Sequence, residues 1–425
     1  MKKHSVCLIF AGLLFLLLIP AVAFAGGQKD KGPEKEVELT FPTFWVGQDS
    51  KSAPIQTLVD RFNEENAGKI RVVIEPNPDT DGYRSKINSG LAAGVVPDIF
   101  VFNPDPTTFG YYESDLLMDF TDDLTGDWAK SFADGYIQAS TMNGVVKSIP
   151  FEIGVTPIWY NEDLFKKAGI NGFPKTFDEF WAAADKLKAA GIVPTSQMTG
   201  GANAWTSMLW YSHILASLGG PTVWERPLTD PIYVKAAEIL LKLYTDGNTT
   251  KDAVGGDAGV AGGHYMAGNT AIFINGPWYI GRIKGDAPAV HAATRLAYAP
   301  AVSGGKYGAM IGFQLSNLAA GNTDDPVKRA AVIKFMKFLT DPENVSMISQ
   351  ASGAMFALKY EMGEDVDPLL KQFIEISSQA SFSVPHFQSQ YRIEVVQELG
   401  QAIGAMVLGK ATPEEFVQML IDVNQ

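Results

Sequence analysis

VELTFPTFWVGQDSKSAPIQTLVDRFNEENAGKIRVVIEP, residues 37–76, decides the fold class. Apolar and polar residues alternate over 37–41, which is typical of a strand. Apolar residues then recur at helical spacing over 55–62, and the alternation returns over 70–74. A strand, a helix and a strand within about forty residues form a βαβ unit, whose strands lie parallel with a right-handed crossover. We therefore expect an α/β protein.

The same two patterns continue along the chain of 425 residues, which is long enough for two or three domains. Residues 82–93 are predicted as a helix and 98–102 as a buried strand, so that 37–150 forms one α/β lobe. A second α/β region follows. A capping box predicts a helix start at Thr176, and a cap predicts another at Thr412. Further helices are expected over 233–244 and 332–339, with a strand over 270–274 and a glycine-rich loop over 255–263.

The first 25 residues carry a targeting signal. Lys2 and Lys3 precede an apolar core, and an Ala-x-Ala pattern ends at Ala25. This arrangement is typical of a secretory signal peptide, so we predict that residues 1–25 are removed by cleavage after Ala25. Residues 26–36 are polar, charged and rich in glycine, which predicts a flexible tether before the fold.

The composition of the mature chain limits its function. The only cysteine, Cys7, lies inside the signal, so no thiol remains for a disulfide or for catalysis. The formal net charge becomes −15, from 32 basic and 47 acidic residues. Nucleic-acid binding needs basic patches, and no compact run of Lys and Arg occurs, so no nucleic-acid partner is expected. No later apolar run is long enough to span a bilayer, so we expect a soluble periplasmic protein.

Enzyme signatures are missing from the sequence. It contains no G-x-S-x-G elbow, no phosphate-binding G-x-x-x-x-G-K-[ST] loop and no H-E-x-x-H motif. The histidines of the mature chain are scattered without metal-ligand spacing, so we expect neither a metal nor a cofactor. We interpret the protein as not an enzyme, although a glycosidase with two carboxyl groups stays open, because such groups can meet from anywhere in a fold.

Aromatic and small polar residues gather at the predicted strand ends. Ligands of open α/β sheets bind outside the carboxyl ends of the strands. A flat ring beside carboxylates and amides suits a sugar, whose C–H groups stack on the ring while its hydroxyls are hydrogen-bonded. For any single aromatic residue, core packing remains the alternative. The candidates are Trp45, Gln48, Asp49, Phe102, Asn103, Asp105, Glu152, Trp205, Trp278 and Tyr391, with Asn275 in the Asn-Gly-Pro turn that ends strand 270–274.

Four stretches give the chain a resemblance to a known family. They are VPDIFVFNPD (96–105), IPFEIGVTPIWYNEDLFKKAGI (149–170), MAGNTAIFINGPW (266–278) and FMKFLTDPENVSMIS (335–349). In order and spacing they resemble the extracellular solute-binding proteins of ABC-type sugar importers, the family that includes maltose-binding protein. The resemblance covers the chain after the tether.

The resemblance implies two α/β lobes, joined by crossing hinge segments, with the ligand in the cleft between them. Crossings are expected near 148–153, 297–301 and Thr340. The implied N-terminal lobe is 37–150 plus about 299–340, and the implied C-terminal lobe is 151–298 plus about 341–425.

The resemblance also implies roles for individual residues. Trp45 and Asp49 match the family's first ligand loop, and Phe102 and Asp105 fall at a stacking and an acidic position. Pro106 falls where maltose-binding protein has an arginine, so the same sugar is not expected. In the second lobe, Glu152 lies close to an acid of the cleft, Trp278 and Tyr391 fall on stacking positions, Arg392 is a possible donor, and Trp205 matches loosely.

We therefore expect a monomeric periplasmic receptor that captures a mono- or oligosaccharide by lobe closure and delivers it to the permease subunits of an ABC importer. Two alternatives stay open. The same fold could bind a polyamine or a phosphate ester, or the protein could be an exported glycosidase.

Overall fold

A computed structural model describes residues 36–104, 108–112, 114–201 and 203–424. The predicted signal peptide, nearly all of the predicted tether, and the candidate Asp105 lie outside these ranges. Residues 36–425 form one compact unit. Its buried apolar side chains form a first core, drawn from Leu39–Phe151 and Leu318–Leu358, and two further clusters, drawn from Ile158–Ile311 and Val366–Leu420. We call the segments around the first core the first lobe and the others the second lobe.

The first lobe begins with the predicted βαβ unit. Strands β1 (Val37–Thr43) and β2 (Ile70–Pro76) pair in parallel, and α1 (Ser52–Glu65) connects them, as predicted. Helix α1 buries its apolar stripe because residues spaced three and four apart share one face. The other elements are α2 (Thr80–Ala92), β3 (Phe100–Phe102), α3 (Phe109–Tyr112), α4 (Gly126–Lys130), α5 (Tyr136–Ala139), β4 (Thr141–Met142), β5 (Val145–Val146), α13 (Pro326–Leu339), α14 (Pro342–Ser352) and β12 (Met355–Phe356).

The second lobe is built on a four-stranded sheet in the order β10-β7-β9-β8. Strand β9 (Thr270–Ile274) is fully buried, as its apolar run predicts, and lies between β7 (Ile158–Asn161) and β8 (Val193–Thr195). The other elements are α6 (Glu162–Lys167), α7 (Phe177–Ala189), α8 (Trp205–Gly219), η1 (Gly220–Glu225), α9 (Pro231–Lys242), η2 (Lys251–Ala253), α10 (Ala258–Met266), η3 (Pro277–Tyr279), α11 (Ile280–Asp286), α12 (Pro288–Ala293), β10 (Thr294–Ala297), α15 (Pro368–Ser378), β13 (Phe382–Val384), η4 (Phe387–Gln390), α16 (Ile393–Val407) and α17 (Pro413–Asp422).

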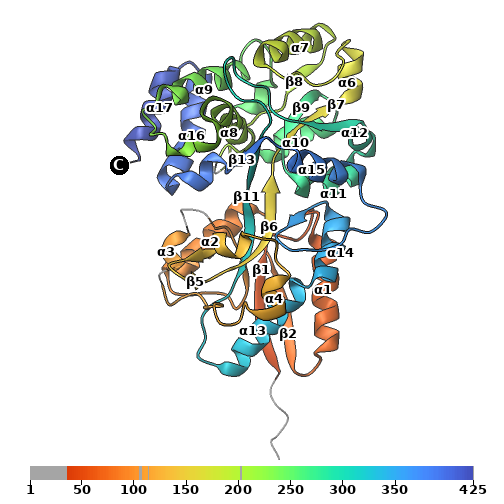
Figure 1. The fold of residues 1–425 in the computed structure, drawn as a ribbon, viewed down its shortest axis with the longest axis vertical. Coiled ribbons are helices and arrows are strands. Elements are labelled where there is room, and N and C mark those ends of the chain that lie inside the picture. Colours follow the sequence, from red (N-terminus) through yellow and green to blue (C-terminus); the bar gives the residue numbers. More distant parts are fainter. Residues whose placement is uncertain (1–35, 105–107, 113, 202, 425) are drawn as a thin grey trace, which may run out of the picture. The chain divides into compact units, whose positions relative to one another are not determined.

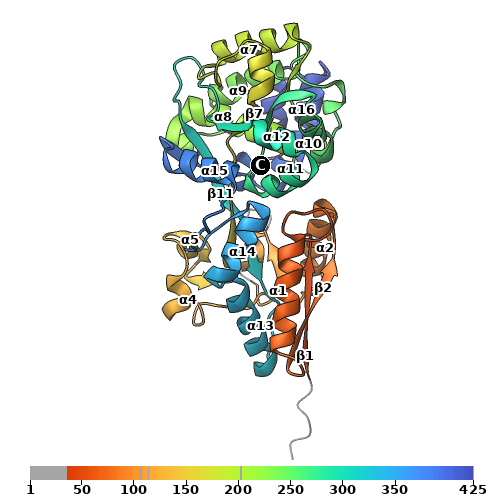
Figure 2. The same cartoon turned by 90° about the vertical axis from the view of Figure 1, so that its right-hand side faces the viewer.

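Two long antiparallel strands run between the lobes (Figure 1). These are β6 (Ile149–Val155) and β11 (Ala309–Ala319). At its start β11 pairs with β13 of the second lobe, and at its end it pairs with β3 of the first lobe. Figure 2 shows helices α1, α13 and α14 in the first lobe, the second lobe above it, and β11 labelled where the two meet. The α/β class and the two-lobed architecture are thus confirmed.

Two of the expected crossings lie elsewhere along the chain. Strand β6 occupies the first expected position, but the second crossing is β11 and not 297–301, because Ala299 and Val302 pack in the second-lobe core. The third crossing does not follow Thr340, because α14 and β12 pack in the first-lobe core. The chain returns to the second lobe between Leu358 and Val366.

The predicted helix caps are present in the structure, whereas the predicted glycine-rich loop is partly helical. The capping boxes at Thr176 and Thr412 are both present, at the starts of α7 and α17. The glycine-rich loop predicted over 255–263 is wrong in its second half, because α10 begins at Ala258. Asp257 caps this helix by accepting a hydrogen bond from the Val260 amide, which compensates for the poor helix propensity of its glycines.

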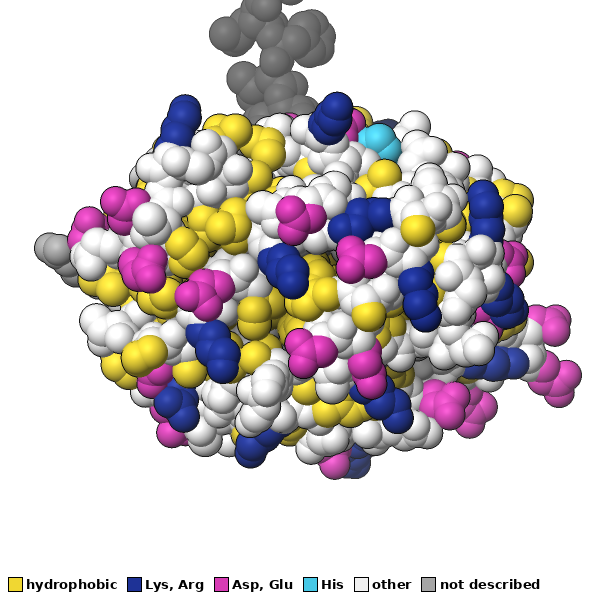
Figure 3. Space-filling view, turned by 90° about the horizontal axis from the view of Figure 1, so that it is seen from above, with side chains coloured by type: hydrophobic (Ala, Val, Ile, Leu, Met, Phe, Trp, Pro, Cys, Tyr) yellow, Lys and Arg dark blue, Asp and Glu magenta, His cyan; other side chains and the backbone are white. Residues whose placement is uncertain are grey.

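The face drawn in Figure 3 carries interspersed Lys, Arg, Asp and Glu side chains. The net negative charge of the chain is therefore not gathered into an acidic patch on this face. Within the described residues, no helix combines the length and the apolar character needed to cross a membrane.

Candidate functional site

A cavity of about 420 Å³ is lined by residues from both lobes and from the crossing strands. Its volume falls within the range typical of small-molecule sites, roughly 300–1,000 Å³. Its lining combines aromatic rings with carboxylates, amides and two cations. The lining residues are Phe44, Asp49, Lys51, Pro78, Asp79, Thr80, Asp81, Arg84, Asn103, Glu152, Met198, Gly201, Asn203, Trp205, Asp257, Ala258, Gly259, Trp278, Leu315 and Ser316.

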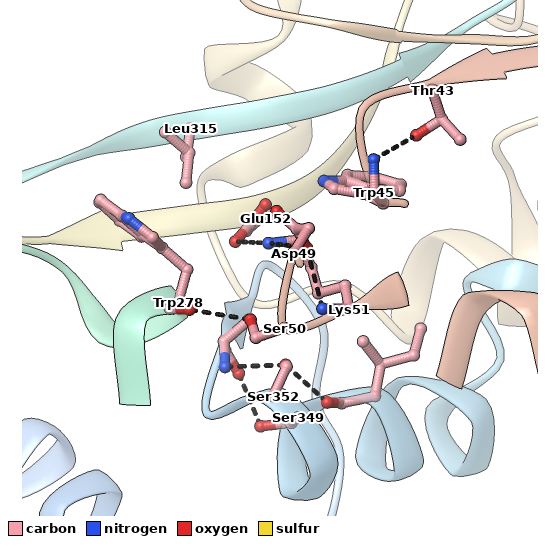
Figure 4. A network of polar contacts seen from close by, with 12 residues as sticks. Thr43, Trp45, Asp49, Ser50, Lys51, Glu152, Trp278, Leu315, Ser349 and Ser352 are labelled. Carbon is pink, nitrogen blue, oxygen red and sulfur yellow. Dashed lines mark hydrogen bonds and ion pairs between the residues drawn. The ribbon is translucent and has the colours of Figure 1, made fainter. Parts of the chain in front are cut away.

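One wall of the cavity is a buried cluster of charges. The Lys51 ammonium lies 3.3 Å from Glu152 Oε1 and 3.4 Å from Asp49 Oδ1. The Lys51 and Glu152 side chains are almost fully buried, whereas the Asp49 side chain is 24% exposed. The lysine also lies over the ring of Trp45, 5.9 Å from its centroid. Figure 4 shows these side chains converging from the loop after β1 and from β6.

Burial and pairing shift the proton affinities within this cluster. Burial raises the pKa of Glu152 to about 7, although the neighbouring Lys51 ammonium pulls that pKa down. Burial alone would lower the pKa of Lys51, but the carboxylates of Asp49 and Glu152 outweigh it and raise the value. Lys51 therefore stays charged, while Glu152 titrates near neutral pH at the wall of the cavity.

Strand β11 is irregular where it passes the cavity. Its pairing with β6 shifts on both sides of Ser316, which lies opposite Glu152. Such bulges re-aim side chains and are frequent beside functional sites. Ser316 is fully buried and lines the cavity, and its hydroxyl has no hydrogen-bond partner among the described residues. The hydroxyl is therefore a buried polar group of the cavity wall that has no partner among the described residues.

The opposite wall is aromatic. The rings of Trp278 and Trp205 lie 6.0 Å apart, and Phe313 of β11 lies 6.4 Å from Trp278. Trp278 follows β9 on the short helix η3, and its ring packs directly on Gly276. A Cβ at Gly276 would lie 2.1 Å from two atoms of the indole, so only glycine admits this ring position. The Asn-Gly-Pro turn thus holds Trp278 at the cavity.

Asn275 supports the aromatic wall from behind. Its side-chain oxygen accepts hydrogen bonds from the Gly276 amide, at 2.9 Å, and from the Trp205 indole N–H, at 3.4 Å. Its backbone carbonyl accepts a hydrogen bond from the indole N–H of Trp159, at 2.8 Å. Asn275 is itself buried and does not line the cavity, so its hydrogen bonds orient the neighbouring rings.

Five of the predicted site residues are brought together at the cavity, namely Asp49, Asn103, Glu152, Trp205 and Trp278. They come from segments far apart in the sequence, which the crossing strands bring to one place.

The other described candidates do not line this cavity. Trp45 and Phe102 are buried in the first-lobe core, because neighbouring rings cover them. Tyr391 packs on Phe387 and its hydroxyl bonds that of Tyr233, so it lies in the second-lobe core. Arg392 is half exposed and pairs with Glu394, away from the cavity lining. Gln48 lines a separate, smaller cavity.

The sequence analysis missed several lining residues. Asp79 and Asp81 follow the carboxyl end of β2, so the rule applied to β1 and β3 would have found them. Arg84 lies one turn into α2, and its guanidinium forms no hydrogen bond or ion pair with another described residue. No local signal indicates Lys51, because its partner Glu152 is distant in the sequence.

The described residues include no cluster of three or more His, Cys, Asp or Glu side chains that could hold a metal ion. The described side chains that line the cavity offer hydrogen-bonding groups, charges and aromatic faces. The protein has two lobes with separate cores, and residues of both lobes line one cavity. This arrangement places it in the class of two-lobed ligand-binding proteins.

Comparison with known proteins identifies the family. Residues 47–346 match the model of the bacterial extracellular solute-binding proteins, and the chain belongs to this family. It is 24% identical to an uncharacterized ABC transporter extracellular-binding protein of Pyrococcus horikoshii, over 99% of this chain and 91% of the relative. It is also 24% identical to the multiple sugar-binding protein of Streptococcus mutans, over 84% of each chain.

Among solved structures, a chitin oligosaccharide binding protein has a similar fold. The TM-score is 0.85 at 23% identity, and the match covers 92% of this chain and 98% of that one. This likeness supports the two-lobed fold.

Proposed function

We propose that this protein is an exported binding protein that captures a mono- or oligosaccharide and delivers it to an ABC importer. The observation that carries the proposal is one cavity that is lined both by the aromatic residues Trp205 and Trp278 and by the polar residues Asp49, Glu152 and Asn103. Sugars combine apolar C–H faces with a rim of hydroxyls, and this cavity offers both kinds of contact.

The polar wall suits hydroxyl groups in particular. Carboxylate oxygens accept hydrogen bonds, whereas Ser316 and Arg84 can donate them, and the Arg84 Nε–H has no partner among the described residues. A buried polar group that a ligand fails to pair costs binding energy, so such groups select ligands with matching hydroxyls. The Streptococcus mutans relative is named a multiple sugar-binding protein, which supports the same substrate class.

Binding in this site is coupled to the arrangement of the lobes. A ligand that contacts both lobes stabilises the arrangement in which both walls reach it, and so shifts the population toward that state. We infer that the permease subunits of the importer recognise this state, that the mature chain begins after Ala25, and that it acts as a monomer without catalysis and without a nucleic-acid partner.

A polyamine is the second candidate. Five carboxylates line the described part of the cavity, from Asp49, Asp79, Asp81, Glu152 and Asp257, against two cations, Lys51 and Arg84. This excess favours a cationic ligand over an anionic one. A phosphate ester fits less well, because Lys51 is already held by two carboxylates.

The proposal is tested by thermal unfolding of the chain from Gly26 with a panel of mono- and oligosaccharides, spermidine and glycerol phosphate. A molecule that binds only the folded state raises the Tm by mass action, by an amount that grows with the logarithm of its concentration over Kd. A rise with a sugar that is recovered unchanged supports sugar capture. A rise with spermidine or glycerol phosphate alone, or hydrolysis of the sugar, would overturn it.

A further inference from the structure

Ser50 links the first lobe to the aromatic wall of the second. It lies between Asp49 and Lys51, on the loop that carries the charged wall of the cavity. Its hydroxyl donates a hydrogen bond to the backbone carbonyl of Trp278, at 2.8 Å, as Figure 4 shows. Ser50 does not itself line the cavity, so this contact acts on the site through Trp278.

Two glycines allow the lobes to approach closely beside this hydrogen bond. A Cβ at Gly281 in α11 would lie 3.0 Å from Ser50 Cβ and 2.9 Å from the carbonyl oxygen of Ser352 in α14. A Cβ at Gly353 would lie 2.5 Å from Ile280 Cβ and 2.9 Å from the carbonyl oxygen of Pro277. Real Cβ atoms essentially never approach below 3.0 Å, so both positions are suited to glycine alone.

We call this contact, made by Ser50, Ser352 and Gly353 of the first lobe and Pro277–Gly281 of the second, the glycine seam. It differs from the crossing strands, because none of its members belongs to β6 or β11. Trp278 is therefore fixed on two sides. Its ring rests on Gly276, and its carbonyl is held across the seam by Ser50.

We propose that Ser50 is a positioning residue for the ligand site: across the glycine seam, it sets where the Trp278 indole stands relative to the charged wall at Asp49 and Glu152. The expected effect of Ser50 on ligand affinity rests on the proposed function. The hydrogen bond between Ser50 and Trp278 does not. The seam forms only when the lobes are this close, so it couples the position of the stacking ring to the arrangement of the lobes.

The contact is tested first by disulfide trapping in the ligand-free chain from Gly26, which has no other cysteine. The pair Ser50→Cys with Gly281→Cys is compared with Ser50→Cys with Gly285→Cys. Gly285 lies on the same helix, and no atom lies within 4 Å of a Cβ placed there. Disulfides have Cβ atoms roughly 3.5–4.5 Å apart, and the Cβ positions of Ser50 and Gly281 lie 3.0 Å apart, so α11 must move outward by about half an ångström or more for the first pair to form the bond. Because Gly285 lies one turn further along α11, the first pair is still expected to oxidise at least about tenfold faster than the second.

The positioning role is tested with Ser50→Ala and Ser50→Thr. In the ligand-free protein, Ser50→Ala is expected to speed hydrogen exchange in the peptide 276–281, because it removes the hydroxyl that donates to the Trp278 carbonyl. Ser50→Thr should restore slow exchange, because threonine keeps this hydroxyl. For a sugar that raises the Tm in the panel above, Ser50→Ala should weaken affinity roughly threefold to tenfold, the effect of one lost hydrogen bond. Gly281→Ala should also weaken sugar affinity, whereas the matched control Gly285→Ala should leave sugar affinity unchanged.

Two results would overturn the inference. One is equal oxidation of the two cysteine pairs, which would show that the lobes do not meet at the glycine seam. The other is unchanged exchange over 276–281 in Ser50→Ala, which would show that Ser50 does not hold Trp278. If no sugar in the panel binds the wild-type chain, the proposed function fails, but both of these measurements still decide whether the seam exists.

Discussion

Trp45 and Trp278 occupy similar positions in the sequence, just after a strand, but differ in how far the fold buries them. Each follows the carboxyl end of a buried strand, β1 or β9. Trp45 is fully buried, because Phe151 of the crossing strand β6 packs against it at 5.5 Å. Trp278 remains partly exposed at the cavity, because its ring packs on Gly276 beside the opening. A strand end therefore determines where a residue lies, but the segment that packs against it decides whether a ligand can reach it.

The largest expected effect comes from removing the buried member of the pair. Trp45→Ala should destabilise the fold by about 3–5 kcal/mol, because the indole leaves a cavity inside the first-lobe core. Urea unfolding of the ligand-free chain measures this loss. A loss below about 1 kcal/mol would mean that Trp45 is not core, and the contrast with Trp278 would fail.

A pH effect is expected from the charged wall between the two tryptophans. The pKa of Glu152 is raised by burial from 4.5 to about 7, so folding favours its protonated form. The stability that this contributes is fully present below about pH 4.5 and is lost as the pH rises through about 7. The loss amounts to at most about 3 kcal/mol.

Glu152→Gln tests this pH effect, because the amide cannot ionise. The unfolding free energies of wild type and Glu152→Gln, measured in urea at pH 5 and pH 8, should differ in their pH dependence, with the variant flatter. Equal slopes would show that another group is responsible. Lys51, the cation that faces Glu152, stays charged throughout this range, because the pKa of its ammonium is raised.

Removing the exposed member of the pair should affect binding instead of folding. Trp278→Ala is expected to weaken sugar affinity roughly 30-fold or more, as truncation of a central aromatic contact does. The unfolding free energy should change by about 1 kcal/mol or less, because the ring is not enclosed on all sides. Isothermal titration with a sugar from the panel measures the affinity. A large loss of stability with little change in affinity would place Trp278 with Trp45.

The smallest effect on binding is expected at Tyr391, which the sequence analysis assigned to the site. Its hydroxyl lies 2.6 Å from that of Tyr233, and its ring packs 4.4 Å from that of Phe387. Tyr391→Leu should therefore leave sugar affinity within about twofold of wild type while lowering stability by about 1 kcal/mol. A tenfold loss of affinity at unchanged stability would restore Tyr391 to the ligand site.

Much of the site could be predicted from strand ends. Asp49, Asn103 and Trp278 were found because the carboxyl ends of strands carry ligand contacts, and they line the cavity. The same rule also selected Trp45 and Phe102, which are core. The rule cannot separate the two groups, because the covering residues come from distant segments.

The charged wall shows what local patterns cannot reveal. Lys51 and Glu152 are about a hundred residues apart in the sequence, and the local partner of Lys51, Asp49, does not indicate that Glu152 joins them. The unpaired hydroxyl of Ser316 arises from a bulge, which depends on the register between β11 and β6. The glycine seam likewise brings together Ser50 and Gly281, which are far apart in the sequence.

The sequence by itself determined the α/β class, the βαβ start, the helix caps at Thr176 and Thr412, and the buried strand before Trp278. These features depend on residues a few positions apart, so periodicity and capping chemistry are sufficient. Only the tertiary structure decided the positions of the later crossings, the burial of Trp45, and the pairing of Lys51 with Glu152. These features depend on which distant segments pack together, and the free energy of that packing is shared among contacts that no local pattern contains.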